Sequence, residues 1–251
     1  MDSRETPTKK IIVPFFVFIL ILVIWELADK VFNFPSIIFP APSEIYKAFI
    51  ENWSVLFTET GITLFESVCG FLLGSIIAYL FAIIFTFSPI LETALYPYAI
   101  AIKSTPLIAI APLLTLWFGN GLPSKIIMSA LVAFFPVLVN SLQGLTSADR
   151  DLENLMKSLA ANKWQILIKV RIPNSLGYLF SSLKIASSLA VVGAVIGEFV
   201  GASQGIGHLI KNTSYYLDTP LMFAGIAMIS SGGILFFGLI VWLEKKLIYW
   251  D

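Results

Sequence analysis

The chain has 251 residues, of which 57% are hydrophobic and 13% are charged, and its formal net charge is zero. Soluble domains carry about 25% charged residues, so this composition favours a membrane protein over one large soluble core. The lack of a basic excess argues against nucleic-acid binding, which needs a positively charged face. The single cysteine, Cys69, lies in an apolar run and is expected to be a packed thiol, because no second cysteine exists for an intramolecular disulfide.

Six apolar stretches are long enough to cross a bilayer, which takes about 20 mostly apolar residues in a helix. They cover residues 11–28, 62–88, 93–118, 126–146, 175–200 and 219–243. The first stretch runs into Trp25 and Glu26 without a small-residue cleavage site, which favours a retained helix over a signal peptide. The sequence thus predicts an all-α, polytopic transmembrane helical bundle with six spans, in one membrane domain over residues 1–251.

Positive charge in the loops predicts the orientation of these spans. With six spans both termini share one side, and that side holds ten Lys and Arg residues against four on the other. We therefore expect both termini, and the polar segment at residues 149–173, to be cytoplasmic. The ten residues are Arg4, Lys9, Lys10, Arg150, Lys157, Lys163, Lys169, Arg171, Lys245 and Lys246, and the four are Lys30, Lys47, Lys125 and Lys211.

Three features lie on the predicted outer side. After an extended segment with three prolines at residues 33–42, Ser43 is expected to cap a surface helix that begins at Glu44 and ends at Phe57. Residues 201–207 read GASQGIG, and a loop or gate turn is favoured over a phosphate cradle because no Lys-Ser/Thr pair follows. His208 has no ligand set near it, so a metal site is not expected.

Polar residues within the third span are candidates for a translocation path, because such groups are costly in lipid and usually face protein or water. Lys103 precedes Ser104, Thr105 and Pro106, and the proline should break the helix there. A broken helix that carries a cation suits the path of an anion. The alternative is a kink from which Lys103 reaches the cytoplasmic interface.

Three other spans carry polar residues of the same kind. Asn140 could bond across helices or touch a solute, and Glu198 could line the path or pair with another helix. Glu66 stands at the start of the second span and is expected to reach the membrane interface.

Residues 149–173 form the one long polar segment between apolar spans, and their pattern predicts a helix. Leu152, Leu155, Met156 and Leu159 follow the spacing i, i+3, i+4, i+7 and share one face. Asp149 or Asp151 can cap its start. Periodicity alone leaves two partners open for this apolar face, a second protein or lipid headgroups.

A second short helix is expected after a tight turn in this insert. Asn162 followed three residues later by Gln165 resembles a capping box that opens a helix over residues 163–170. Pro173 should end that helix, and Asn174 or Ser175 can cap the following span. The insert is therefore predicted to be a two-helix hairpin.

The insert resembles the EAA loop of ABC importer permeases, in the nitrate/sulfonate/taurine branch. That loop runs roughly E-A-A-R-T-L-G-A-S-R-W-Q-L, then a gap, then L-P. The agreeing positions are Lys157, Ser158, Leu159, Ala161, Lys163, Trp164, Gln165 and Pro173. Residues 39–45, 104–121, 133–145 and 215–226 resemble other segments of the same branch in the same order. The chain departs from the family where Asn154 replaces the leading Glu, Ala160 replaces the Gly and Asn162 replaces the Ser.

This resemblance implies a permease of the type I importer fold with a cytoplasmic coupling hairpin, in a prokaryotic inner membrane. It implies a pair of ATPase subunits that bind ATP and Mg²⁺, since this chain contains no P-loop of its own. It also implies a second permease copy, with a homodimer expected, and an extracytoplasmic binding protein that delivers a small solute. The implied coupling residues are Leu152, Asn154, Leu155, Met156, Ser158, Leu159, Ala160, Ala161, Asn162, Lys163, Trp164 and Pro173.

The solute is expected to be an anion such as nitrate, a sulfonate or taurine, with a thiamine precursor or riboflavin as the alternative. A secondary transporter that uses no ATPase would predict internal repeats or several buried charges, and neither is clear in the sequence. A membrane enzyme would need clustered His, Asp, Glu or Cys, and the chain has one His and one Cys. No bound cofactor or metal is expected in this chain.

Overall fold

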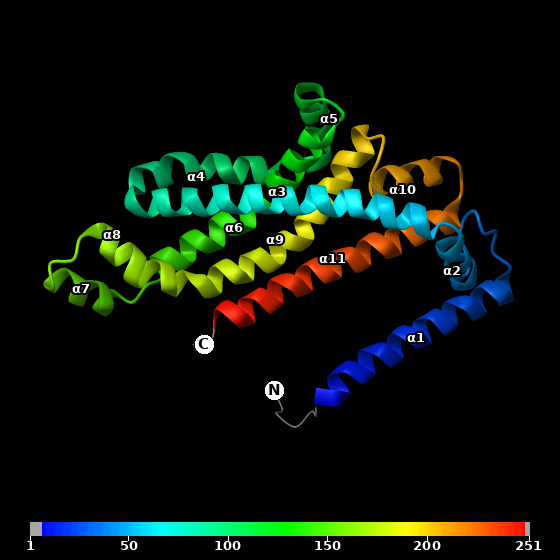
Figure 1. Ribbon diagram of the computed structural model, residues 1–251, viewed down its shortest axis with the longest axis horizontal. Coiled ribbons are helices and arrows are strands. Elements are labelled where there is room, and N and C mark those ends of the chain that lie inside the picture. Colours follow the sequence, from blue (N-terminus) through cyan, green and yellow to red (C-terminus); the bar gives the residue numbers. More distant parts are fainter. Residues whose placement is uncertain (1–6, 249–251) are drawn as a thin grey trace. The chain divides into compact units, whose positions relative to one another are not determined.

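The computed structural model describes residues 7–248, without the side chains of residues 7–11, 89, 96, 99–104 and 107. This part of the chain is helical throughout, as predicted (Figure 1). Its helices are α1 (Pro7–Phe32), α2 (Pro42–Glu51), α3 (Trp53–Phe87), α4 (Pro89–Ser104), α5 (Leu107–Phe118), α6 (Leu122–Thr146), α7 (Arg150–Ser158), α8 (Lys163–Ile166), the π-helix η1 (Leu167–Arg171), α9 (Ile172–Gly201), α10 (Ile206–Tyr215) and α11 (Thr219–Leu247).

Five helical stretches within residues 7–248 are long and apolar enough to cross a membrane, where the sequence predicted six. They are Ile12–Phe32, Trp53–Phe87, Leu122–Thr146, Lys163–Gly201 and Thr219–Leu247. The remaining predicted span, residues 93–118, is divided between the shorter helices α4 and α5. The break falls at Pro106, as predicted, because proline has no N–H to donate and its ring clashes with the preceding turn.

The chain divides into two compact units, each made of two segments. Unit 1 contains Met1–Phe57 and Leu209–Met228, and unit 2 contains Thr58–His208 and Ile229–Asp251. The single membrane domain expected from the sequence stays a prediction.

Unit 1 joins α1 to α2 through polar contacts. The Glu26 carboxylate of α1 accepts hydrogen bonds from the Ser43 backbone N–H and hydroxyl, both at 3.1 Å. Ser43 is therefore not the helix cap predicted for it. Instead α2 begins after Ala41, whose N–H donates to the Glu44 side chain at 3.1 Å, and it ends before Asn52 rather than at Phe57.

Unit 2 is built on α3, α6 and α9, whose small residues allow close helix packing. A Cβ on Gly74 of α3 would collide with the backbone of Ala130 in α6. A Cβ on Gly193 of α9 would lie 2.8 Å from the Ser129 Cα of α6. Because glycine carries no side chain, these backbones approach as closely as membrane helices do at small-residue seams. The serines and glycines of α9 thus pack within one chain.

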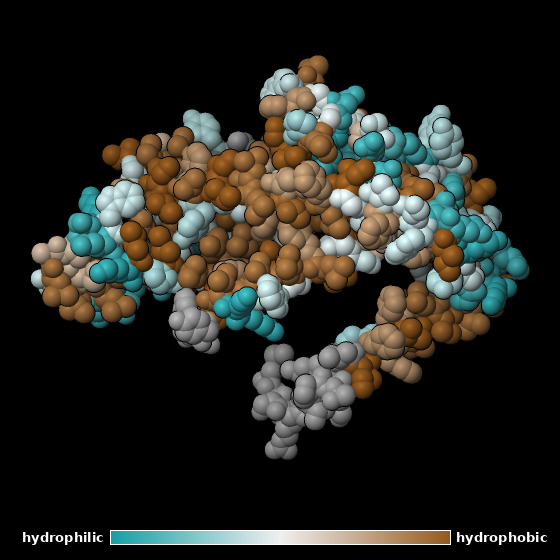
Figure 2. All heavy atoms as spheres, in the orientation of Figure 1, coloured by the Kyte–Doolittle hydropathy of each residue, from teal (hydrophilic) through white to brown (hydrophobic). Residues whose placement is uncertain are grey.

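The outward faces of the unit 2 helices are apolar. Figure 2 shows brown side chains along α3, where Ile76, Leu80 and Ile84 are all exposed. A soluble domain does not expose apolar surface on this scale, whereas lipid tails cover it without cost. Teal residues appear among brown ones at the end that holds α7 and α8, which belong to the predicted polar insert.

Candidate functional site

Helix α7 presents an apolar face at the surface of unit 2. The Asp149 carboxylate caps it by accepting from the Asp151 backbone N–H at 2.8 Å, which confirms one of the two predicted caps. Leu152, Leu155 and Leu159 are 51%, 56% and 70% exposed. Three exposed leucines on a short helix between charged neighbours form a surface that a partner can cover.

The turn after α7 places Ala160 in the left-handed region, with φ = 56°. The Ala161 N–H donates to the Met156 carbonyl and the Ala160 N–H to the Lys157 carbonyl, both at 3.0 Å. This pair of bonds is the Schellman motif that ends a helix, and its left-handed position is usually glycine. The family's glycine aligns with this position, so the departure at Ala160 carries a conformational cost here.

Replacing Ala160 with glycine should stabilise the hairpin. The left-handed conformation costs a residue with a Cβ about 1–2 kcal/mol, and glycine's extra chain entropy returns about 0.5–1 kcal/mol of that. We expect a net gain of about 0.5–1 kcal/mol, seen as slower hydrogen exchange at the Ala161 amide. Ala161→Gly is the matched control, since Ala161 does not have a positive φ, and it should bring no gain. Equal effects of the two substitutions would contradict this account.

The second helix of the insert opens as the sequence predicted. The Gln165 N–H donates to the Asn162 side chain at 2.9 Å, and the Asn162 N–H donates to the Gln165 side chain at 2.8 Å. This reciprocal pair confirms the capping box. Trp164 follows it and lies against Phe87 at the end of α3, with ring centroids 4.8 Å apart.

Pro173 does not end this helix, contrary to the prediction. The five residues before Ile172 form the π-helix η1, and the helix continues through Pro173 into α9. A π turn changes which carbonyl each N–H reaches, so it accommodates a residue that cannot bond to position i−4. Asn174 and Ser175 also do not cap. The Asn174 amide donates to the Gly144 carbonyl at 3.1 Å and thereby ties α9 to α6.

An ion pair that sequence reasoning missed fixes α7 against η1. The Arg171 guanidinium donates to both carboxylate oxygens of Glu153, at 2.7 and 3.2 Å. Bidentate pairing of this kind is both strong and directional. The two residues are 18 positions apart in the chain, so no local pattern could indicate the contact.

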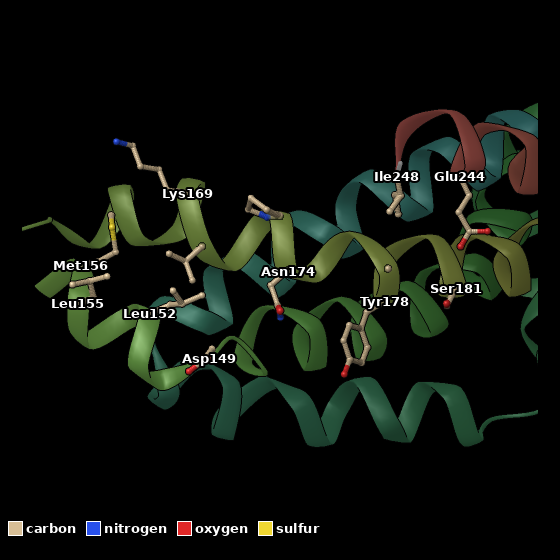
Figure 3. A pocket seen from close by; sticks show the side chains of 13 residues that line it. Asp149, Leu152, Leu155, Met156, Lys169, Asn174, Tyr178, Ser181, Glu244 and Ile248 are labelled. Atoms are coloured by element: carbon tan, nitrogen blue, oxygen red, sulfur yellow. The ribbon is translucent and has the colours of Figure 1, made fainter. Parts of the chain in front are cut away.

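The apolar face of α7 borders an open hollow of about 930 Å³ (Figure 3). Leu152, Leu155 and Met156 form its α7 wall, next to the cap residue Asp149, and η1, α9 and the end of α11 contribute the rest. The other lining residues are Lys169, Val170, Pro173, Asn174, Gly177, Tyr178, Ser181, Glu244 and Ile248. Leu152 and Leu155 therefore belong to a concave surface with polar groups around it.

The translocation path suggested by the sequence stays a prediction. The side chains of Lys103 and Ser104 lie outside the described residues, and Thr105 is exposed at the break before Pro106. The Asn140 amide donates to the Pro136 carbonyl of its own helix at 2.8 Å. Neither the predicted bond across helices nor a solute contact is needed to satisfy that donor.

A second hollow lies within the apolar part of unit 2. It has a volume of about 420 Å³ and is lined by α3, α4 and α6. Phe81 and Phe85 from α3 and Phe134 and Phe135 from α6 belong to its wall, and none of the described side chains that line it is charged. Its size and aromatic lining suit a small apolar or ring-shaped molecule.

Glu198 belongs to a buried charge cluster at the far end of α9 from the insert. Glu198, Lys125 and Glu66 are 0%, 1% and 3% exposed. The expectations of an interfacial Glu66 and of a loop position for Lys125 are therefore wrong. Lys125 donates to the carbonyls of Asn120, at 2.5 Å, and of Gly201, which closes the last turn of α9.

The described residues thus combine helices of membrane length with a polar hairpin between α6 and α9 and a buried charge cluster at the opposite ends of these two helices. Residues 70–249 match the family model described as binding-protein-dependent transport system inner membrane component. The chain belongs to this family. The permease is a multi-pass inner-membrane subunit of an ABC importer, and membership implies an ATPase and a binding protein as partners.

Two relatives share about a third of the permease's residues. The formylaminopyrimidine transport permease protein ThiX of Halalkalibacterium halodurans is 34% identical over 94% of this chain and 95% of its own. The riboflavin transport system permease protein RibX of Chloroflexus aurantiacus is 35% identical over 92% of this chain and 87% of its own. A chain of the MetNI methionine ABC transporter, in inward-facing conformations, has the same fold, with a TM-score of 0.62 and 19% identity over 78% of this chain and 97% of that chain.

Proposed function

We propose that the permease couples to its ATPase through the hairpin of α7 and α8. The exposed apolar face of α7 is the observation that carries this proposal. A partner with a hydrophobic groove can bind a helix whose apolar residues are spaced in this way. The Asp149 cap, the Schellman turn and the Glu153–Arg171 pair hold that face in one orientation. A preorganised surface of this kind lowers the entropy cost of docking.

The wider assembly is proposed from the family. Two permease copies form the path, two ATPase subunits bind ATP and Mg²⁺ on the cytoplasmic side, and a binding protein delivers the solute from outside. We propose that both termini and the hairpin are cytoplasmic, which requires α4 and α5 together to cross the membrane once. The charge count supports this orientation, with ten Lys and Arg residues against three once the buried Lys125 is left out. Closure of the ATPase pair would move the two hairpins and switch access from one side to the other.

We propose a small heteroaromatic solute of the thiamine-precursor or riboflavin kind. The two relatives named for such molecules support this class, and so does the aromatic lining of the 420 Å³ hollow, where no described side chain is charged. The anion expected from the sequence depended on Lys103, whose side chain lies outside the described residues. Nitrate, sulfonates and taurine are therefore the competing solutes in the experiment below.

Reconstitution in vesicles tests both the importer function and the proposed class of solute. The permease, its ATPase and its binding protein should take up labelled formylaminopyrimidine or riboflavin only with ATP. The control is an ATPase in which the P-loop Lys is replaced, because that Lys contacts the nucleotide phosphates. Uptake that continues with this ATPase would refute the importer function. ATP-dependent uptake of taurine or nitrate alone would refute only the heteroaromatic class.

A further inference from the structure

The segment after α9 is held against α3 by buried carboxylate and hydroxyl groups. The Thr63 hydroxyl donates to Glu198 Oε1 at 2.6 Å and accepts from the Ile206 N–H at 2.8 Å. Glu198 Oε2 accepts from the Gly207 N–H at 2.5 Å. The Gly205 N–H donates to the Glu59 carboxylate. Three consecutive backbone amides at the start of α10 thus bond to side chains of α3 and α9.

The glycines of this segment are explained by the Glu198 carboxylate. A Cβ on Gly205 would collide with that carboxylate, and its φ of 101° is also unfavourable for a residue with a Cβ. A Cβ on Gly207 would lie 2.6 Å from Glu198 Oε2. Gly205 and Gly207 therefore allow the backbone of this stretch to pack directly against the buried Glu198 carboxylate. We define Thr63, Glu198 and residues 205–207 as the latch.

The latch lies entirely within unit 2, near both ends of its first segment. Unit 2 begins at Thr58, one residue before Glu59, and its first segment ends at His208, one residue after Gly207. The latch thus joins the two points at which α3 enters unit 2 and α10 leaves it. It is also remote from the hairpin, since α6 separates them by 25 residues, or about 37 Å.

The latch is buried but its charges are not fully matched. Glu66 lies close enough to Glu198 and Lys125 for its charge to interact with both, and its Oε2 has no hydrogen-bond partner among the described residues. The Lys125 ammonium donates to two backbone carbonyls, and among the described residues no ion pair within 4.0 Å joins it to either acid. A buried polar network strongly favours one closed geometry when each of its polar atoms has a hydrogen-bond partner. It loses much of that preference when one partner is removed.

We propose that Thr63 and Glu198 are positioning residues for transport, which hold residues 205–207 closed in the resting permease and release them when access switches. This rests on the proposed function. The hydroxyl of Thr63 is the critical group, because it bonds to the acid and to the moving backbone at once. Removing it should favour the released state without changing any residue of the hairpin.

Hydrogen exchange on the purified permease, without ATPase, tests whether Thr63 and Glu198 keep residues 205–207 closed. Thr63→Val keeps the shape of the side chain but leaves the Ile206 N–H and Glu198 Oε1 without their shared partner. Exchange across residues 205–207 should become about tenfold faster, since two hydrogen bonds of ordinary net strength are lost. Thr63→Ser should restore the wild-type rate. Thr86→Val is the matched control on α3, because the Thr86 hydroxyl donates only to the Ala82 carbonyl within that helix, at 2.9 Å.

ATP hydrolysis by the assembled transporter tests the role in transport. Without solute and binding protein, Thr63→Val should raise hydrolysis about tenfold, and Thr63→Ser should return it to the wild-type rate. A variant that merely destabilised the fold would lower hydrolysis instead. Glu198→Gln is the second variant if Thr63→Val does not fold, since its amide N–H₂ would face the Gly207 N–H.

The outcomes separate the two proposals. Unchanged exchange across residues 205–207 overturns the latch, and faster exchange with unchanged hydrolysis overturns its role in transport. If the wild-type permease does not bind or regulate an ATPase, the proposed function fails, whereas the exchange result on the permease alone still decides whether the latch exists.

Discussion

Replacing Leu155 and Leu159 together with aspartate should release the ATPase from the permease. Both side chains are more than half exposed, so the folded unit tolerates the change, whereas a docked interface would bury two unpaired carboxylates. Loss of two central apolar anchors typically costs at least 2 kcal/mol each at a hot spot, which corresponds to a loss of affinity of about 1,000-fold. Co-purification from detergent and ATP-dependent uptake should both disappear.

The control for this double variant is Ile38→Asp. Ile38 is 74% exposed and lies far from the hairpin in sequence, on the predicted outer side. It carries the same type of change from an exposed apolar residue to a charge, and it should leave co-purification intact. Normal ATPase binding by the Leu155→Asp/Leu159→Asp variant, with the fold preserved, would exclude α7 as the docking helix.

Replacing Lys125 with methionine should cause the largest loss of stability in the molecule. The change leaves Glu66 and Glu198 without their buried cation and the carbonyls of Asn120 and Gly201 without their donor. Two buried carbonyls left without a donor cost about 1–3 kcal/mol each, and the nearby acids lose the only cation that compensates their charge among the described residues. A large drop in thermal transition temperature, or loss of the monodisperse peak in size-exclusion chromatography, is the expected result.

Two further variants test whether the loss of stability comes from the buried charge cluster. Adding Glu66→Gln to Lys125→Met removes one of the uncompensated acids and should recover part of the lost stability. Lys47→Met is the surface control, because Lys47 makes an exposed ion pair with Glu51 at 3.9 Å, and such pairs contribute about 0–1 kcal/mol. A Lys125→Met variant that melts at the wild-type temperature would show that the charge cluster does not stabilise the fold.

Features decided by a few neighbouring residues were predictable from the sequence. The capping box at Asn162, the cap at Asp149 and the helix break at Pro106 all depend on chemistry within one or two turns of helix. The apolar stripe of α7 followed from its spacing in the same way. The positive φ at Ala160 also agrees with the glycine that the family has there.

Features that join distant parts of the chain were not predictable in this way. Lys125 and Glu66 read as loop and interface residues because they stand near the ends of apolar stretches, and only the packing of α3, α6 and α9 buries them together. A faint signal was present, since Glu59, Thr63 and Glu66 recur at helical spacing on α3. The prediction that Pro173 ends the helix was wrong for a local reason. The rule that proline ends a helix assumes an α turn, and η1 supplies a different one.

The helices α8, η1 and α9 form one continuous stretch that can carry motion from the hairpin to the charge cluster. Lys163–Gly201 is one helical stretch of 39 residues, about 58 Å long, with Trp164 near one end and Glu198 near the other. Tilting such a rod by about 10° around its midpoint moves its two ends by roughly 5 Å in opposite directions. Because η1 lies between Trp164 and α9, the stiffness of its irregular bond pattern sets how much of a small angular motion at the hairpin becomes an ångström-scale displacement at Glu198.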